Sequence, residues 1–437
     1  MIGTIAAVTS LLLSVTILVA GNGLQNTLIS VRANLEAFPT AQIGFLISGY
    51  FAGYVAGSFA GPRMIKRVGH IRAFAALAAI AAAAALTQAL LVDPWVWTGL
   101  RAITGFCFVG LYMIIESWLN ERTPNETRGR MLSLYRMIEL SAVLAGQLLL
   151  TIADPAGFTL FCIVSILICL ALVPVALTKA EAPAPIRSAR IRLLKLYRLS
   201  PLGMVGAFII GVANGAFWGL APIFIQNAGL SIDTVAYFMS FCVLGGIVFQ
   251  WPIGRLSDRF DRRTVLIIVC FLGAASAAGL VVVSEMSLIA LFVLAVFYGG
   301  LTMPLWPLSV AHTNDYVEPR EFVETSGGLL LTFGIGAIIG PSAASFVMQA
   351  FGGWALFAFN AAAFGLLGLF GLYRTTRRAP VPMHRQEQFV PVTDTTPAVF
   401  EFDPRGEAPE PVPEATSEAP SDDAEANRTS TSAPLNG

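Results

Sequence analysis

Three ionisable residues lie within long apolar stretches of the sequence, where a charged group is costly unless it is paired or hydrated. Glu116 lies near the end of one stretch, and Arg136 and Glu139 lie in the next, three residues apart and so on one helix face. A carboxylate whose proton affinity is set by a nearby arginine can bind and release a proton. The trio therefore predicts either a proton-coupling site or a structural ion network between the two segments.

Arg101 is a fourth charged residue inside an apolar stretch. It could neutralise a carboxylate of a solute, bias a proton step, or extend outward to the membrane surface. The second half of the chain contains no deep carboxylate, because Asp233, Glu285 and Glu324 lie near the ends of their stretches. This asymmetry predicts charge coupling in the first half and largely neutral contacts from the second.

Amides and aromatic residues within the apolar stretches could line a solute site, or could serve only packing and hydrogen bonds between helices. Pro304 and Pro307 flank one of the aromatic residues and would interrupt a helix there, which predicts a gating hinge. The candidate polar and aromatic contacts are Asn22, Gln25, Asn26, Asn214, Gln250, Trp218 and Trp306.

The composition indicates what positions these residues. Of 437 residues, 56% are hydrophobic and 12% are charged, whereas ordinary globular chains carry about 25% charged residues. Because a transmembrane helix needs roughly 20 apolar residues, the chain is predicted to be an all-α membrane protein. The twelve predicted spans are 4–30, 40–60, 73–92, 95–119, 131–152, 157–178, 201–226, 233–253, 264–283, 287–312, 323–349 and 354–373.

Lys and Arg are distributed very unequally between the two ends of the predicted spans. Outside the spans, 21 of them in the body of the chain fall on the side that holds both termini, and only Arg32 falls on the other. This bias predicts that both termini are cytoplasmic. The first span begins almost at Met1 without a basic region or a cleavage site, which indicates an uncleaved helix. The five cysteines lie in apolar stretches and predict no disulfide framework.

A repeat with an offset of 192 residues relates the two halves. It places Asn22 on Asn214, Gly53 on Gly245, and Arg67 on Arg259. Six spans per copy predict two pseudo-symmetric six-helix bundles, at 1–178 and 201–373, joined by a cytoplasmic linker at 179–200. A site between such bundles can face either side as they rock. Glycine-rich helix surfaces could let helices approach and slide, although tight packing in a static bundle would favour the same residues. These glycines are Gly49, Gly53, Gly57, Gly245, Gly246, Gly334, Gly336 and Gly340.

The C-terminal region, 374–437, differs from the rest in composition. From residue 379 onward it holds 11 acidic residues and three arginines, and it is rich in proline. Such a segment buries too little apolar surface to offset its ordering entropy. We therefore expect a disordered acidic cytoplasmic tail, which either is only solvated or binds a partner.

One loop carries a recognisable motif. Residues Gly254–Arg263 read G-R-L-S-D-R-F-D-R-R, which resembles the G-x-L-[AS]-D-R-x-G-R-[RK] signature of the major facilitator superfamily (MFS) and departs from it at Asp261. The equivalent loop of the first half matches less well, with Lys66 in place of the aspartate. Arg101 and Gly105 are similar to the R-x-x-x-G motif of the family. Three further features resemble a bacterial inner-membrane branch with poorly defined substrates: Glu116-Ser117, Arg128-Gly129-Arg130 and Trp251–Leu256.

The resemblance implies the MFS fold and an alternating-access secondary carrier in the bacterial cytoplasmic (inner) membrane. In that fold the first, fourth, seventh and tenth helices line a central cavity, which places Asn22 and Asn214 on two of them. It also brings the loop after the second helix close to the eleventh helix.

Charged loops on the cytoplasmic side predict a gate. We expect Lys66 or Arg67 to pair with Glu321 or Glu324 when the inner gate is shut. On the other seam Asp258 would pair with Arg128 or Arg130, and Arg259 repeats Arg67 in this second loop. Exposed pairs contribute under about 1 kcal/mol each, so they would bias the gate without locking it.

The sequence contains no P-loop, no H-E-x-x-H motif, no Cys/His cluster and no nucleophile elbow. These motifs would indicate direct ATP drive, a metal site or an enzyme, so we expect no cofactor, no metal and no enzyme activity. The sequence instead favours a monomeric, proton-coupled secondary transporter of a small organic solute, with efflux preferred and no nucleic-acid partner. The alternatives are a metabolite uptake symporter and a non-transporting membrane sensor on the same fold.

Overall fold

The computed structural model describes residues 2–177, 192–283, 287–318, 321–377, 381–383, 386 and 388–396. Over these ranges the regular structure is entirely helical, and twelve helical spans are long and apolar enough to cross a membrane. Twelve transmembrane helices were predicted, and this is confirmed. Most of the predicted linker, 179–191, and most of the predicted tail, including 397–437, lie outside the described residues.

The first bundle contains six long helices joined by short turns. A proline and an acidic cap begin the fourth helix: Pro94 occupies its first turn, and Asp93 accepts hydrogen bonds from the backbone of Trp95 and Val96. The elements are α1 (Ile2–Leu35), α2 (Thr40–Val68), α3 (His70–Leu90), α4 (Pro94–Arg122), α5 (Arg128–Leu148) and α6 (Thr159–Leu177), with short 3₁₀ helices η1 (Asn125–Thr127) and η2 (Leu149–Ile152).

The second bundle repeats this arrangement after a short helix that was not predicted in the linker. Its tenth span is broken between α11 and α12 at Pro304, which cannot donate a helical N–H; the predicted interruption is confirmed. The elements are α7 (Leu193–Leu199), α8 (Pro201–Asn227), α9 (Ile232–Arg259), α10 (Arg262–Val283), α11 (Leu288–Thr302), α12 (Leu305–Asn314), α13 (Phe322–Phe351) and α14 (Ala355–Thr375).

The largest boundary differences occur at the ends of α2 and α9. The predicted spans end at residues 60 and 253, but the helices continue to Val68 and Arg259. Pro62 and Pro252 lie inside the helices and do not end them. The apolar stretch ends where the helix leaves the predicted membrane zone, whereas the backbone hydrogen bonding continues, so hydropathy alone places these ends too early.

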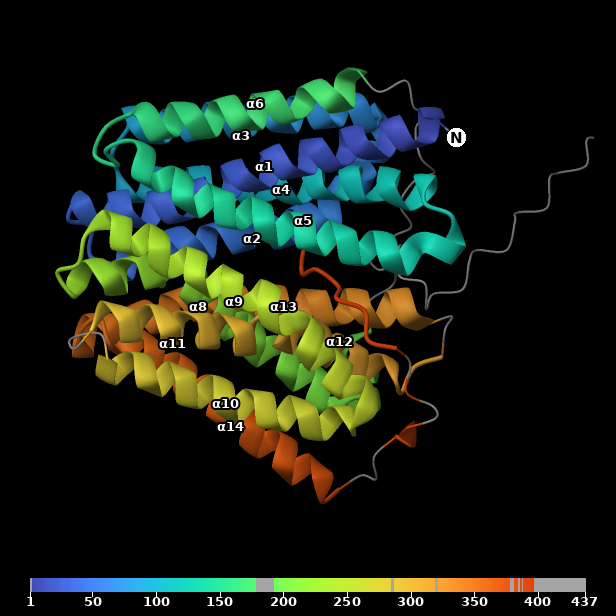
Figure 1. Cartoon of the computed structure of the whole chain (residues 1–437). Coiled ribbons are helices and arrows are strands. Elements are labelled where there is room, and N and C mark those ends of the chain that lie inside the picture. The colour runs from blue at the N-terminus through green and yellow to red at the C-terminus, as the bar shows by residue number, and fades with distance from the viewer. Residues whose placement is uncertain are drawn as a thin grey trace, which may run out of the picture. The chain divides into compact units, whose positions relative to one another are not determined.

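The two bundles lie side by side, with α1–α6 in blue to green and α8–α14 in green to red (Figure 1). They meet along two seams, α2 against α13 and α5 against α9. The turns that carry most of the Lys and Arg residues lie at one end of the helices, together with the beginning of α1 and the end of α14 (right-hand side of Figure 1). We call this end the basic face, and the other end the opposite face.

Several glycines bring helix backbones into direct contact inside each bundle. A Cβ on Gly53 of α2 would lie 1.8 Å from the carbonyl oxygen of Ala102 in α4, and one on Gly340 of α13 would lie 2.0 Å from that of Val212 in α8. In this structure both glycines therefore serve tight helix packing within a bundle, which the sequence left as the alternative to sliding. Gly334 is different, because it faces Val55 across the α2–α13 seam.

Candidate functional site

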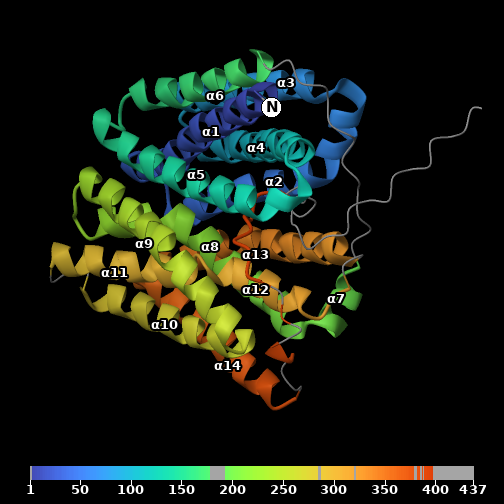
Figure 2. The ribbon, with the colours of Figure 1, turned by 45° about the vertical axis from the view of Figure 1, so that its right-hand side comes forward.

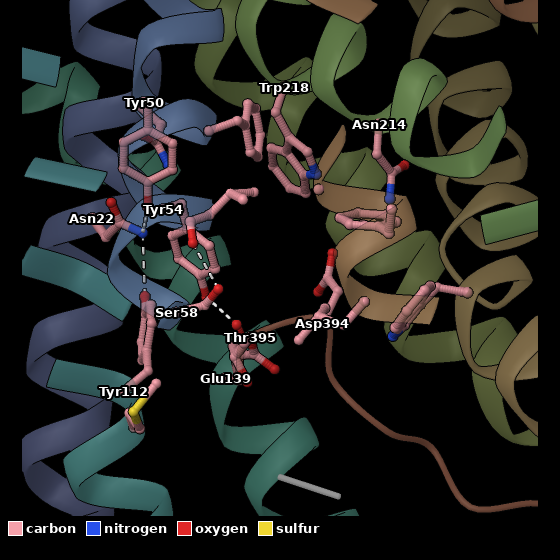
Figure 3. Close-up of a pocket in the computed structure, with 18 of the residues that line it drawn as sticks. Asn22, Tyr50, Tyr54, Ser58, Tyr112, Glu139, Asn214, Trp218, Asp394 and Thr395 are labelled. Carbon is pink, nitrogen blue, oxygen red and sulfur yellow. Dashed lines mark hydrogen bonds between the residues drawn. The ribbon is translucent and has the colours of Figure 1, made fainter. Parts of the chain in front are cut away.

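A cavity of about 470 Å³ lies between the bundles, within the range of about 300–1,000 Å³ typical of small-molecule sites. Helices α1, α2, α4 and α5 supply one wall, and α8, α12 and α13 supply the other (Figure 3). Eight of the residues predicted to bind a solute or couple charge line this cavity: Asn22, Asn26, Arg101, Arg136, Glu139, Asn214, Trp218 and Trp306.

The cavity is closed toward the opposite face and reaches the basic face. Near the opposite face, Asn34 of α1 donates to Gln226 of α8 at 3.1 Å. Along the α2–α13 seam, the Ser48 hydroxyl donates to the backbone carbonyl of Ile338 at 2.6 Å. The lining extends to Phe59 and Arg63, which are exposed near the basic-face end of α2. The structure therefore shows a state open toward the basic face.

Asn22 joins three helices at the wall of the first bundle. Its amide nitrogen donates to the hydroxyl of Tyr50 in α2 at 3.3 Å and to that of Tyr112 in α4 at 3.2 Å (Figure 3). Its amide oxygen is buried and has no hydrogen-bond partner among the described residues. This oxygen is available to accept a hydrogen bond from a solute or from water.

Arg101 is buried, with 1% of its surface exposed, and does not extend to the membrane surface. Its Nη2 donates to Oδ1 of Asn26 at 2.5 Å, and its guanidinium lies 4.2 Å from the ring centroid of Tyr50. A cation over an aromatic face is stabilised electrostatically. The Nε and Nη1 atoms have no hydrogen-bond partner in the described part of the chain. The cavity wall therefore presents a cation whose remaining N–H groups can donate to a ligand.

Arg136 and Glu139 form the ion pair that their spacing in α5 predicts. Arg136 Nη1 lies 2.8 Å from Glu139 Oε2, and both side chains are buried in the cavity wall. Burial of either charge without its partner is unfavourable, so the two depend on each other.

Glu116 lies next to this pair without joining it. Its side chain is buried, and it accepts a hydrogen bond at 3.0 Å from Tyr135, the residue before Arg136. Its other hydrogen bonds come from the hydroxyls of Thr395 and Thr396. No ion pair joins Glu116 to Arg136 among the residues described. The predicted three-membered charge cluster is therefore an ion pair beside a separately hydrogen-bonded carboxyl group.

Gln25 and Gln250 do not line the cavity. Gln25 donates to Gln88 of α3 at 3.2 Å within the first bundle, which is the interhelical bonding that the sequence left as an alternative. Gln250 is buried in α9, and neither end of its amide has a partner among the described residues. These two amides therefore do not contact the site in this state.

The wall supplied by the second bundle carries no charged side chain among the described lining residues. Trp306 follows the break at Pro304 and packs on Phe333, with ring centroids 4.9 Å apart. Trp218 and Asn214 come from successive turns of α8, and both are half-buried. The expected asymmetry between a charged first wall and a neutral second wall is present at this cavity.

The acidic residues of the expected gate have other partners in this state. Glu321 pairs with Lys195 at 2.5 Å, and Glu324 lies 3.9 Å from Arg192. Both basic partners belong to the α7 segment, beside the beginning of α13 (Figure 2). Lys66 and Arg67 are exposed and make no ion pair among the described residues. Because the predicted pairs concern a shut gate, they stay a prediction.

Asp258 accepts hydrogen bonds from Arg262 at 3.3 Å and from the backbone N–H of Phe389 at 2.8 Å. Arg262 also pairs with Asp315 at 2.6 Å and is buried. The sequence singled out Asp258 but missed the Arg262–Asp315 pair, although both residues lie in charged segments at the predicted cytoplasmic side. The remaining gate candidates, Arg128, Arg130 and Arg259, lie at the basic-face ends of α5 and α9, and the last two are exposed.

Sequence reasoning missed two groups in the site. One is the tyrosine set of Tyr50, Tyr54 and Tyr112, of which Tyr112 lies four residues before Glu116 and so shares its helix face. The other is the segment 388–396, part of the predicted disordered tail, which reaches the cavity with Asp394 and Thr395 and is described below. Its apolar start, Phe389–Val392, was the available signal.

Two six-helix bundles around a central cavity, open at one face and closed at the other, form the architecture of two-bundle membrane transporters. The chain belongs to the Major Facilitator Superfamily, whose model matches residues 11–304 and 203–413. The family suggested by the loop signature is confirmed.

The curated relatives share this family. The chain is 29% identical over 360 residues to the uncharacterized MFS-type transporter YcaD of Escherichia fergusonii, which covers 82% of this chain and 93% of that protein. Among solved structures it resembles the nucleoside transporter NupG, with a TM-score of 0.73, 13% identity, and coverage of 85% of this chain and 100% of that one.

A bacterial homologue of the human lysosomal transporter Spinster, in an inward-facing and occupied conformation, gives a TM-score of 0.68 at 15% identity. The match covers 86% of this chain and 97% of the homologue. At these identities, the two structures establish the MFS fold and leave the solute open.

Proposed function

We propose that the protein moves a small organic solute across the cytoplasmic membrane by alternating access, coupled to protons, and that it favours export. One observation carries the proposal: a single cavity between two bundles has titratable groups on one wall and uncharged aromatic residues on the other. A carrier needs such a site to hold its solute and its coupling ion together while the bundles rock around it.

The coupling step is proposed at the Arg136–Glu139 pair. While Glu139 is ionised it neutralises Arg136 at 2.8 Å. Protonation of Glu139 removes that attraction, and a buried cation without a partner is unfavourable. Arg136 then favours an anionic group of a solute, or water that enters the cavity. Glu116, held by Tyr135 one residue away from Arg136, is a second proton acceptor on the same path.

The solute is proposed to be amphiphilic. The unpaired donors of Arg101 favour an acidic or strongly polar group, whereas Trp218 and Trp306 supply apolar surface on the facing wall. The neutral second wall favours export of such compounds. The same free donors of Arg101 favour a second candidate, uptake of an organic acid by proton symport.

The orientation and assembly belong to the same proposal. We assign the basic face to the cytoplasm because Lys and Arg accumulate there, and we propose an inner-membrane monomer. The open state of the structure is then inward-facing. In the shut state Lys66 or Arg67 would replace the basic residues of the α7 segment as the ion-pair partner of Glu321 or Glu324.

The test is a flux screen in proteoliposomes with an imposed pH gradient and a panel of amphiphilic acids and their neutral analogues. Glu116→Gln and Glu139→Gln should lose gradient-driven flux while retaining exchange of solute across the membrane. Glu121→Gln is the matched control, because Glu121 is exposed at the end of α4 outside the cavity. Undiminished gradient-driven flux in both Glu116→Gln and Glu139→Gln would remove these carboxylates from the coupling role.

A further inference from the structure

Residues 388–396 run between the two bundles (red in Figure 1), and Asp394 and Thr395 line the cavity. The segment belongs to no helix and bends at Asp394 and Thr395. Val390, Val392, Thr393, Thr395 and Thr396 are buried there. An acidic, proline-rich tail is thus locally ordered where its sequence becomes apolar and rich in threonine.

The segment is anchored first at the basic-face end of α9. The backbone N–H of Phe389 donates to Asp258 at 2.8 Å. The ring of Phe389 packs against Gly254 so closely that a Cβ on that glycine would lie 2.4 Å from the ring. Both contacts involve the loop signature, so the tail engages a surface that the gate is expected to use.

Farther along, the segment contacts both bundles at once. Trp306 of α12 donates to the backbone carbonyl of Thr393 at 3.1 Å, and Tyr54 of α2 donates to that of Thr395 at 2.5 Å. Backbone carbonyls of the segment therefore accept hydrogen bonds from both facing walls. A segment held in this way bridges the bundles.

The end of the segment reaches the proposed coupling groups. The hydroxyls of Thr395 and Thr396 donate to Glu116. The side chain of Asp394 lines the centre of the cavity (Figure 3), and it makes no hydrogen bond or ion pair with the rest of the described chain. The tail therefore brings a carboxylate and two hydroxyls to positions that a solute or water would otherwise occupy.

We propose that residues 388–396 are an intramolecular ligand of the cavity, which excludes solute and holds the basic face open until it leaves. That the segment inhibits transport rests on the proposed transport function. That the segment occupies the cavity does not depend on this function. Bridging both bundles opposes their rocking, and the Phe389 contact takes Asp258 away from any gate partner.

The length of the tether to α14 sets the occupancy expected of such a ligand. Thirteen residues, 376–388, separate the end of α14 from Phe389 and span up to about 45 Å when extended. A short tether gives an effective concentration on the order of millimolar. A segment with a dissociation constant of about 0.1 mM in trans would then occupy the cavity about 90% of the time.

Labelling of a cavity cysteine measures this occupancy without any knowledge of the solute. Ser58 lines the cavity near Thr395 and bonds only within its own helix, so Ser58→Cys is a suitable reporter. The exposed Cys169 and half-buried Cys162 are replaced by alanine. Vesicles that expose the basic face are treated with a membrane-impermeant maleimide.

Three chains are compared: the full chain, one ending at residue 378, and one ending at residue 406. We expect labelling about tenfold faster in the first truncation, since occupancy of about 90% leaves one tenth of the sites open. The chain ending at residue 406 keeps the segment and should label as slowly as the full chain. Equal rates in all three, or fast labelling of the chain ending at 406, would overturn the proposal.

Two further measurements guard against a truncated chain that misfolds. A synthetic peptide of residues 386–398 added to the shorter chain should restore slow labelling, and a scrambled peptide should not. In the full chain, Thr395→Val with Thr396→Val removes the hydroxyls at Glu116 and should speed labelling. Thr375→Val with Thr376→Val, at the end of α14 outside the cavity, should not. No acceleration by the first pair, or no protection by the peptide, would contradict the proposal.

Flux separates the inference from the function on which it rests. If the solute screen identifies a transported compound, removal of residues 379–437 should raise its flux about tenfold by the same occupancy argument. Accelerated labelling with no transport of any compound would support the ligand and contradict the carrier. If truncation left the labelling rate unchanged but abolished a signal that depends on the tail, the result would favour a tail-signalling sensor. It would overturn the proposal that residues 388–396 are a ligand of the cavity.

Discussion

The two walls of the cavity come from bundles related by a repeat, yet they carry different chemistry. The first wall presents Arg101, the Arg136–Glu139 pair and a hydrogen-bonded amide–tyrosine set. The second presents Trp218, Trp306 and a half-buried amide, with no charge among its described residues. The two bundles thus each contain six spans while their cavity walls carry different side chains. We infer that charge coupling belongs to one copy and recognition of the solute's apolar surface to the other.

The repeated asparagines show the same difference at one position. Asn22 is tied to Tyr50 and Tyr112, whereas Asn214 makes no hydrogen bond within the described residues. Equivalent residues therefore hold helices together on one side and face open space on the other. Variants that act on one wall and spare the other can test this division.

The largest effect is expected from Arg136→Ala. It leaves Glu139 buried without its partner, which costs roughly 3–5 kcal/mol for a buried pair, so thermal stability in detergent should fall steeply. The double variant Arg136→Ala with Glu139→Ala should recover most of the loss. Lys195→Ala, which breaks the exposed pair with Glu321, should change stability by under about 1 kcal/mol. Similar losses of thermal stability in Arg136→Ala and Lys195→Ala would show that the buried pair of the first wall contributes no more than an exposed pair.

Arg101→Gln should come next, acting on solute recognition. Loss of a charged donor to an acidic group costs roughly 1.5–3 kcal/mol, so flux of an acidic solute should fall about tenfold to a hundredfold relative to its neutral amide. Arg72→Gln, an exposed arginine at the basic face, is the control. An unchanged ratio of acid to amide flux would show that Arg101 stabilises the helices without reading the solute.

The asparagine pair sharpens the comparison at lower energy. Asn22→Ala removes two hydrogen bonds worth about 1 kcal/mol each and should lower thermal stability measurably. Asn214→Ala removes none among the described residues and should leave stability within about 0.5 kcal/mol, while raising the half-saturating concentration of solute. Equal destabilisation by the two variants would argue against the division between walls.

The smallest effect concerns the gate. Lys66→Glu should slow transport, and adding Glu321→Lys should restore it, because the shut state would regain an opposite-charge pair. The change should correspond to under about 1 kcal/mol, since both side chains are exposed or half-buried. Arg72→Glu provides a charge reversal outside the pair. If the double variant did not restore transport, the predicted pair between Lys66 and Glu321 would be contradicted, and Lys195 would remain the partner of Glu321.

The sequence predicted most reliably those features for which burial of a polar or charged group in the membrane is energetically costly. Spans such as 157–178 fall within a few residues of α6, Thr159–Leu177, because an apolar stretch of that length has few alternatives. Arg101, Arg136 and Glu139 were identified for the same reason, since an unexplained charge inside a span demands a function. These are constraints that composition and position reveal directly.

The missed features depend on packing that a linear pattern does not contain. Nothing local shows that Tyr50 and Tyr112 meet around Asn22, since a tyrosine in an apolar helix is equally suited to lipid or to the interior. Gln25 was predicted to line the cavity. In a helix that is apolar on all sides, the sequence does not show which way an amide side chain points. The tail was judged by its average composition, which hides the four apolar residues beginning at Phe389.

The glycine contacts have a consequence for how such a carrier could change over time. Gly53 and Gly340 hold neighbouring helices in direct backbone contact. In the proposed rocking motion each such helix pair would turn as one unit, and the adjustable parts would be the seams and the side chains on the inner surface. Substitutions on that surface can then alter which compound is accepted without disturbing the turning motion. Substitutions along α2–α13 and α5–α9 can retune the turnover rate without altering selectivity. We expect the two properties to respond to separate sets of mutations.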